Sequence, residues 1–473
     1  MYRCFTRACL AAAAVVALST MGVAGASASG AVPRSRQAMR VSPARTSLAA
    51  SPGTQLWAKP YNGTGNNADV ATSVAVSPTS GTVYVTGWSY GTGDVVVDYA
   101  TVAYNAATGV RQWVARYNGP TGSNNVPSSV AVSPDGKSVF VTGKSTLGQN
   151  GDYATVAYDA ANGTQKWAKP YGPANGFSQA SSVAISPDGK TVYVTGESAA
   201  PNANFDYATV AYDATNGTQK WAKRYNDPVN GSDQAASLTV SPTSGTVYVT
   251  GHSWSGTSTD YATVAYNAAG VRQWAARYKT AGANNAATSV AVSGGTVAVT
   301  GSSQNAGPGA TFDYATVAYD ATNGTQKWAM RYNGTGNNSD QASSAAISGG
   351  TVYVTGKSTG AGTGLDYATV AYSAANGHQQ WVTRYNDPGN GTDIATSLAV
   401  NPANGTVYVT GQSQPGENYA TVAYTATNGT QKWAKRHTGS ELYSSSVAVS
   451  PTTGTVFVTG MTLQDYITIA YSG

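Results

Sequence analysis

The chain has 473 residues, and its formal net charge of +5 arises from six arginines within the first 50 positions. The remainder holds 21 of the 27 basic residues against all 22 acidic ones and has no lysine or arginine cluster, which argues against partners such as nucleic acid or an acidic membrane surface. Both cysteines, Cys4 and Cys9, lie at the N-terminus, so the rest of the chain has no disulfide and no thiolate metal site.

The N-terminal residues have the features of a secretory signal. Arginines precede a short apolar stretch at residues 10–18, and Ala-Ser-Ala at residues 26–28 fits a cleavage site for signal peptidase. We therefore predict a signal peptide over residues 1–28, a flexible leader or pro-segment over residues 29–53, and a secreted, extracellular mature protein. A tail that contacts the cell wall or a membrane is the alternative for the leader.

From residue 54 onwards the chain is a tandem repeat, whose tryptophans recur every 52 to 56 residues. Each copy holds four short segments in which apolar and polar residues alternate, for example residues 182–186, 191–196, 206–212 and 219–225. This two-residue period predicts β-strands, and turn sequences rich in Gly, Asn and Pro separate them. No stretch shows a sustained helical period, so we predict an all-β fold.

Four strands in each of eight copies predict an eight-bladed β-propeller over residues 54–473, with four-stranded antiparallel blades. We name the strands A to D from the centre of the ring outwards, in the order of the four segments above. A ring buries both faces of every blade against its neighbours. Because the repeat begins with a D strand, residues 55–61, and ends with a C strand, residues 465–471, we expect the N-terminal strand to close the last blade.

A specific pattern, A-x-D-x-x-x-G-x-x-x-W, joins strands C and D, as in Ala157, Asp159, Gly163 and Trp167. Its tryptophan recurs as Trp57, Trp113, Trp167, Trp221, Trp274, Trp328, Trp381 and Trp433. The pattern resembles the tryptophan-docking motif of the eight-bladed quinoprotein alcohol dehydrogenase-like propellers, the PQQ-repeat superfamily. The chain is also similar to bacterial SBBP-type β-propeller repeats. The resemblance implies that each tryptophan packs against the next blade.

The resemblance carries little of the catalytic machinery of that superfamily. Its dehydrogenases use an adjacent cysteine pair, a calcium ion held by acidic and amide side chains, and an aspartate base beside the quinone. The mature chain has no cysteine, and no residue matches that catalytic set. We therefore expect no PQQ and no catalytic residues, and the resemblance favours the non-catalytic members, which bind proteins.

The loops predict where a binding site lies. The A–B and C–D turns are short and uniform, whereas the D–A loops, such as residues 225–234, and the B–C loops, such as residues 302–312, are long and varied. In a propeller these two sets of loops share one face, which we call the loop face. Because function tends to reside in varied loops on a rigid frame, we expect any binding site here, at the mouth of the central channel.

One position near the loop face varies while its neighbours stay almost constant. It follows Val-Thr-Gly of strand B and is occupied by Trp88, Lys144, Glu197, His252, Ser302, Lys357, Gln412 and Met461. The candidate ligand-binding ring consists of Trp88, Lys144, Glu197, His252, Lys357 and Gln412. Neutral variation at a solvated strand end is the alternative interpretation.

Two D–A loops carry recurring aspartates, Asp227 with Asp233 and Asp387 with Asp393, each pair with an asparagine midway. Oxygen ligands on a glycine-rich loop suit calcium, which makes these four residues weak metal candidates. The spacing differs from that of an EF-hand, and Asp and Asn also cap turns through the backbone, so a structural role is the alternative.

A further aspartate opens strand C in most repeats. It occurs as Asp98, Asp152, Asp206, Asp260, Asp313 and Asp366. Because it recurs in nearly every blade, one active site cannot depend on it, and we expect it to make a structural hydrogen bond.

Together these features predict a secreted, non-enzymatic and monomeric propeller, without a transmembrane segment, that binds a protein or a cell-surface glycan through its loop face. One alternative is an enzyme at the channel mouth, either a PQQ- and calcium-dependent dehydrogenase or a carbohydrate-active enzyme. Another is a surface protein with only a spacer role.

Overall fold

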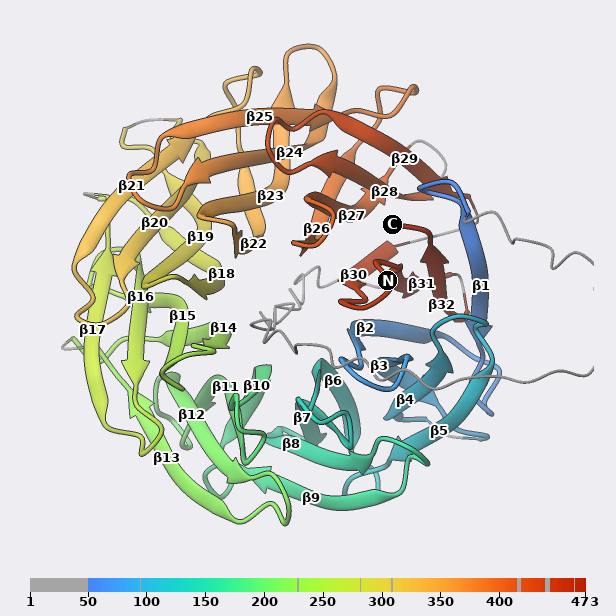
Figure 1. Ribbon diagram of the computed structural model, residues 1–473. Coiled ribbons are helices and arrows are strands. Elements are labelled where there is room, and N and C mark those ends of the chain that lie inside the picture. The colour runs from blue at the N-terminus through green and yellow to red at the C-terminus, as the bar shows by residue number, and fades with distance from the viewer. Residues whose placement is uncertain are drawn as a thin grey trace, which may run out of the picture.

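The computed structural model describes residues 50–93, 95–227, 229–280, 282–307, 309–414, 418–438, 443–462 and 464–473. These residues form 32 strands, arranged as eight four-stranded antiparallel blades around a common axis (Figure 1). The predicted all-β, eight-bladed propeller is therefore confirmed. Among these residues no helix is present that could cross a membrane.

Each of blades 1 to 7 runs from the axis outwards in chain order, as predicted, and in blade 8 the outermost strand is the first strand of the chain. The A strands are β2 (Asp69–Val76), β6 (Asn124–Val132), β10 (Phe177–Ile185), β14 (Asp233–Val240), β18 (Asn285–Ser293), β22 (Gln341–Ser348), β26 (Asp393–Asn401) and β30 (Tyr443–Val449). The B strands are β3 (Thr82–Tyr90), β7 (Ser138–Leu147), β11 (Thr191–Ala199), β15 (Val247–Trp254), β19 (Thr296–Gln304), β23 (Thr351–Gly360), β27 (Thr406–Ser413) and β31 (Val456–Met461).

The two outer layers complete the blades. The C strands are β4 (Val97–Asn105), β8 (Asn150–Asp159), β12 (Asp206–Asp213), β16 (Thr259–Tyr266), β20 (Phe312–Asp320), β24 (Gly364–Ser373), β28 (Asn418–Thr425) and β32 (Tyr466–Tyr471). The D strands are β5 (Arg111–Tyr117), β9 (Gln165–Tyr171), β13 (Gln219–Tyr225), β17 (Arg272–Tyr278), β21 (Gln326–Tyr332), β25 (Gln379–Tyr385), β29 (Gln431–His437) and, in blade 8, β1 (Gln55–Tyr61). Strands B and C are almost wholly buried because neighbouring blades cover them, whereas the D strands stay partly exposed at the rim.

The N-terminal strand closes the ring, which confirms the predicted closure. β1 pairs antiparallel with β32, with Trp57 opposite Ala470, and blade 8 has the order β1-β32-β31-β30 (Figure 1). Just before β1, the amide of Gly53 donates to the carbonyl of Ser472 at 2.8 Å, and the amide of Ser472 donates to Thr54 at 2.9 Å. The predicted signal peptide and most of the predicted leader lie outside the described residues, but Gly53 belongs to the ring.

The hydrophobic core lies between blades. Each of the eight core clusters within the described residues contains side chains from two neighbouring blades. At a typical interface the indole Nε1 of Trp167 donates to the carbonyl of Ala214 in the next blade, at 3.1 Å. Gly217 packs on the same indole, and a Cβ there would lie 2.7 Å from the ring, so the close contact requires glycine. The tryptophans thus pack against the next blade, as the resemblance implied.

The closing interface departs from this pattern. Among the described residues, the buried Nε1 of Trp433 has no hydrogen-bond partner, although Gly473 occupies the position of the alanine whose carbonyl accepts this bond in the other blades. The packing glycine is nevertheless present, since Gly53, with φ of 78°, lies against Trp433 as Gly217 does against Trp167. The two ends of the propeller together rebuild the apolar part of the contact but not its hydrogen bond.

Truncating a docking tryptophan should strongly destabilise the ring wherever it lies in the chain. We expect Trp57→Ala and Trp167→Ala each to lower the free energy of unfolding by about 3–5 kcal/mol, as for other buried tryptophans. Chemical denaturation measures this, with Trp254→Ala, which is 37% exposed, as the control. A negligible effect at Trp57 would contradict closure by β1.

The missing hydrogen bond at the closing interface gives a finer test. Trp381→Phe removes the donor to the Ala426 carbonyl, which lies 2.9 Å away, and leaves that acceptor only the longer hydrogen bond from the Tyr353 hydroxyl at 3.3 Å. Trp433→Phe removes only part of the ring, because its Nε1 has no partner among the described residues. Trp381→Phe should therefore destabilise the protein by about 1 kcal/mol more than Trp433→Phe in thermal or chemical denaturation. Equal losses would show that Trp433 is satisfied in solution.

Candidate functional site

The strand register brings the D–A and B–C loops to one face, as predicted. The start of each A strand lies beside the end of its B strand, as Asp233 opposite Ser253 shows. The start of each C strand lies beside the end of its D strand, as Tyr207 opposite Tyr225 shows. The long, varied loops and the short, uniform turns therefore occupy opposite faces of the disc.

The six residues of the candidate ring, and Ser302 and Met461 at the same position of the other two blades, lie at one level of the B strands. His252, for example, lies between Gln234 of strand A and Tyr261 of strand C, and Lys144 lies between Val126 and a corresponding tyrosine. All eight are half-buried: Trp88, Lys144, Glu197, His252, Ser302, Lys357, Gln412 and Met461. They form a ring one strand removed from the axis, and ligand binding by this ring stays a prediction.

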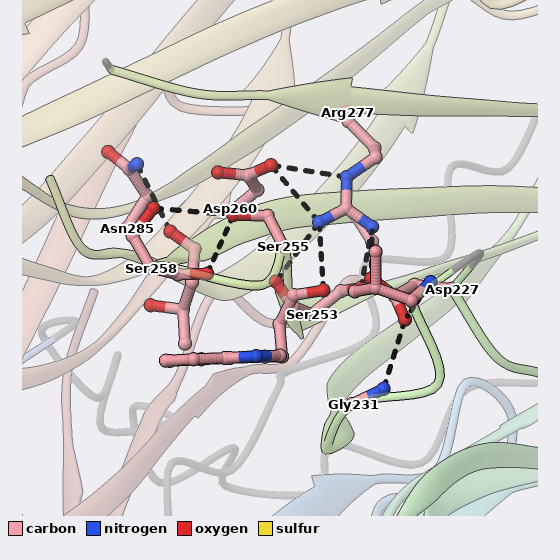
Figure 2. A network of polar contacts seen from close by, with 12 residues as sticks. Asp227, Gly231, Ser253, Ser255, Ser258, Asp260, Arg277 and Asn285 are labelled. Atoms are coloured by element: carbon pink, nitrogen blue, oxygen red, sulfur yellow. Dashed lines mark hydrogen bonds and ion pairs between the residues drawn. The ribbon is translucent and has the colours of Figure 1, made fainter. Parts of the chain in front are cut away.

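A polar network beneath the loop face joins the loops in several blades, and Figure 2 shows it in blade 4. The guanidinium of Arg277, on strand D, pairs with the Asp260 carboxylate at 3.0 Å. It also donates to the hydroxyl of Ser253 at 2.8 Å and to the carbonyl of the same residue at 3.1 Å. From the preceding D–A loop, Asp227 forms a longer ion pair with Arg277 at 3.6 Å.

The same arginine–aspartate pair recurs around the ring. The N–O distances are 3.1 Å for Arg116–Asp98, 2.9 Å for Arg224–Asp206, 3.0 Å for Arg331–Asp313 and 2.8 Å for Arg384–Asp366. The aspartate that opens strand C is therefore structural in these blades, as expected, but its arginine partner was not foreseen. The sequence did contain a hint of this pair: in these five repeats an arginine precedes the last aromatic residue of strand D. Two other repeats also begin strand C with aspartate, and there Pro60 and Pro170 replace the arginine.

The four metal candidates serve the loops that contain them. Asp227 accepts the amide of Gly231 at 3.1 Å, and the amide of Asp227 in turn donates to Asp233 at 2.9 Å. Asp387 and Asp393 make the second copy of this arrangement, also at 2.9 Å. Asp387 additionally pairs with Arg436 at 2.8 Å, as Asp227 does with Arg277. No group of three or more metal-ligating side chains occurs within the described ranges, and calcium at these loops stays a prediction.

Burial perturbs the carboxyls that begin the A strands. Desolvation raises the pKa of Asp393 to about 6, although hydrogen bonds from Ser413 and from the amide of Asp387 oppose this shift. The charges of Asp387 and Asp366 add to the increase. Burial likewise raises the pKa values of Asp69, Asp233 and Asp340.

The eight four-stranded blades and the tryptophan that docks each blade on the next define a β-propeller of the PQQ-repeat type. A family model described as outer membrane protein assembly factor BamB matches residues 53–303, 154–360 and 263–467, and the chain belongs to this PQQ-repeat family. A comparison with curated protein sequences finds no match.

Solved propellers of differing function have similar folds. Quinohemoprotein alcohol dehydrogenase from Comamonas testosteroni is 13% identical with a TM-score of 0.51, over 89% of this chain and 76% of that one. A europium-containing methanol dehydrogenase is 12% identical with a TM-score of 0.55, over 88% and 93% of the two chains. Sqt1 of Chaetomium thermophilum, bound to the N-terminus of ribosomal protein L10, is 13% identical with a TM-score of 0.57, over 86% and 97%. Such similarity shows the fold alone.

The raised pKa of Asp393 predicts a pH dependence of stability. Because its folded-state pKa of about 6 lies above the ordinary 3.8, the folded protein holds this proton more tightly than the unfolded chain. The resulting stabilisation is present below about pH 4 and is lost as the pH rises through 6. Asp393→Asn removes this titration and can still accept the amide of Asp387.

The measurement is Tm of both proteins between pH 4 and 7. We expect the Tm of the wild type to fall relative to that of Asp393→Asn as the pH rises across this range. Parallel profiles would contradict the shift. The exposed Asp135→Asn, on an A–B turn, is the matched control.

Proposed function

We propose that this protein is a secreted, non-enzymatic β-propeller that binds a protein or a cell-surface glycan through its loop face. The observation that carries the proposal is the half-buried ring in strand B, in which one side chain changes from blade to blade while the frame stays constant. Buried neighbours hold the backbone at this level in the same register in every blade, as Tyr207 and Tyr261 show. The side chains at this position can therefore differ between blades without disturbing the propeller fold.

Exposed aromatic residues at the same face support contact with a partner. Trp254, at the end of β15, is 37% exposed and stands next to the B–C loop of blade 4. Trp88 packs edge-on against Tyr90, with ring centroids 6.1 Å apart. Tryptophan and tyrosine contribute strongly at protein interfaces because they bury a large area and keep a polar atom for hydrogen bonding.

The comparisons favour two kinds of function. Sqt1 is a propeller seen with a segment of another protein bound, which supports a binding role for this fold. The similarity to two dehydrogenases supports the second candidate, an enzyme that uses the mouth of the propeller with a quinone and calcium. The binding role is preferred because the loop-face aspartates described above fold their own loops.

Face-specific variants test the binding role. Peptide and glycan arrays probed with the purified protein supply a ligand, and its affinity is then measured for two double variants. Trp254→Ala with Lys144→Ala changes the loop face, and Val110→Ala with Lys137→Ala changes the opposite face. We expect the loop-face variant to bind at least 30-fold more weakly, as when a hot-spot residue worth about 2 kcal/mol is lost. Equal losses in both variants would contradict the assignment of the face.

Adding PQQ and calcium to the purified protein tests the enzymatic alternative. Stoichiometric changes in quinone absorbance, accompanied by reduction of an acceptor dye with an alcohol or sugar, would replace the binding role by a dehydrogenase. N-terminal sequencing of the exported protein tests secretion.

A further inference from the structure

Blade 2 lacks the arginine of the polar network. Its D strand carries Pro170 opposite Ala154, whereas blade 3 carries Arg224 opposite Ala208 at the same register. No side chain of strand D can therefore reach Asp152 as Arg224 reaches its own aspartate. In blade 3 the space beside the aspartate is filled by the arginine side chain.

The acceptors of the missing guanidinium are nevertheless present. Asp152 and Ser145 face each other across β7 and β8, as Asp206 and Ser198 do across β11 and β12. Among the described residues, no group donates a hydrogen bond or forms an ion pair to the Asp152 carboxylate or the Ser145 hydroxyl. In blade 3, by contrast, Arg224 donates to Asp206 at 2.9 Å and to the Ser198 hydroxyl at 3.0 Å.

An open cavity of about 250 Å³ lies where the arginine is missing. Asp152 and Ser145 line it together with Pro120, Leu147 and the glycine-rich loop 172–176. Gly172 is needed for this opening, since a Cβ there would come within 2.1 Å of the Asp152 carboxylate. Asp152 is half-buried, as is Asp206 of blade 3, whereas the aspartates that hold an arginine in blades 1, 4 and 6 are at most 4% exposed.

A tyrosine of the preceding blade lies close enough to Asp152 to feel its charge. In blade 6, Arg384 donates to the hydroxyl of Tyr332, on the D strand of blade 5, at 3.2 Å. The corresponding residue beside blade 2 is Tyr117, whose pKa is raised by burial and by the charge of Asp152. Burial also raises the pKa of Asp152 itself, as expected for a carboxyl without a cation beside it.

Blade 8 carries the same replacement with a different neighbouring residue. Pro60 replaces the arginine there, but Thr462 stands where the other blades have serine. Its hydroxyl accepts the amide of Asp465 at 3.1 Å, and Oδ1 of that aspartate is buried without a hydrogen-bond partner among the described residues. Blade 2 instead keeps the serine, and both Ser145 and Asp152 line the cavity.

We propose that the blade 2 cavity binds the guanidinium group of an arginine side chain supplied by a partner protein. The guanidinium would donate hydrogen bonds to the Asp152 carboxylate, to the hydroxyl and carbonyl of Ser145 and to the hydroxyl of Tyr117. The equivalent groups in the other blades accept hydrogen bonds from the arginine of their own strand D. A guanidinium suits this set because it offers five donors in a planar fork and no acceptor. The cavity opens on the loop face, so this inference rests on the proposed binding function and names the chemistry of its partner.

The test uses the full-length protein and short blocked peptides that contain one arginine, with citrulline and lysine peptides as controls. At pH 7.5, ligand-observed NMR should give a Kd on the order of 1 mM for the arginine peptide, as for a single small contact. Citrulline, which lacks the charge, and lysine, which lacks the fork, should each bind at least tenfold more weakly. Free arginine distinguishes the source: weaker binding supports a peptide-borne side chain, and equal binding supports a small guanidine in the same site.

Two variants locate the binding. Asp152→Asn should weaken arginine binding at least tenfold without unfolding the blade, because the Asp152 carboxylate has no partner among the described residues. Pro170→Arg restores the sequence of the sister blades, and its own side chain should fill the cavity, abolish peptide binding and raise Tm. Asp135→Asn is the control that changes the same charge on the opposite face.

Several outcomes would overturn the inference. These are no binding by the wild type, equal binding of lysine or citrulline, or binding kept by Asp152→Asn. None of them affects the face-specific variants proposed above, which leave Asp152 and Pro170 unchanged. Failure of the guanidinium site and failure of the loop-face binding role are thus distinguishable.

Discussion

The packing of each tryptophan against the next blade is the contact on which the whole ring depends. A four-stranded sheet exposes two apolar faces, and here each face is buried only by a neighbouring blade. The tryptophan reaches across this interface from the outermost strand, so it joins the rims of two blades while the valines of strands B and C fill the space between them. Because the ring is closed, no blade is left with an uncovered apolar face.

The closing interface shows how this contact survives a break in the chain. Gly53 and the C-terminal residue pair Ser472 and Gly473 stand where a continuous C–D turn would be, and the glycine still packs on the indole. The hydrogen bond to the indole is the part that is lost, since Nε1 of Trp433 has no partner among the described residues even though Gly473 stands where the other blades have the accepting alanine. Non-directional apolar packing tolerates a break between chain ends better than a directional hydrogen bond does.

The sequence predicts the fold well because strand period, turn residues and repeat length all describe the same blade. It predicts the level of the variable ring for the same reason, since His252 and its counterparts follow an invariant Val-Thr-Gly. It failed to pair Arg277 with Asp260, because this contact runs between two strands at a diagonal and has no signature in local spacing. It treated Asp227 as a metal candidate, and only the coordinates bring this residue to the arginine of the following D strand.

The repeats also make a single departure informative. In a protein without repeats, an unpaired carboxylate in a small cavity has no internal reference, and a structural role is hard to separate from a binding role. Here the sister blades show the same serine and aspartate with a guanidinium hydrogen-bonded to both, in the same register. The geometry for holding a guanidinium is therefore already established in this molecule. Blade 2 keeps that geometry and has lost only the side chain that fills it, so its acceptors are preorganised for a cation supplied from outside.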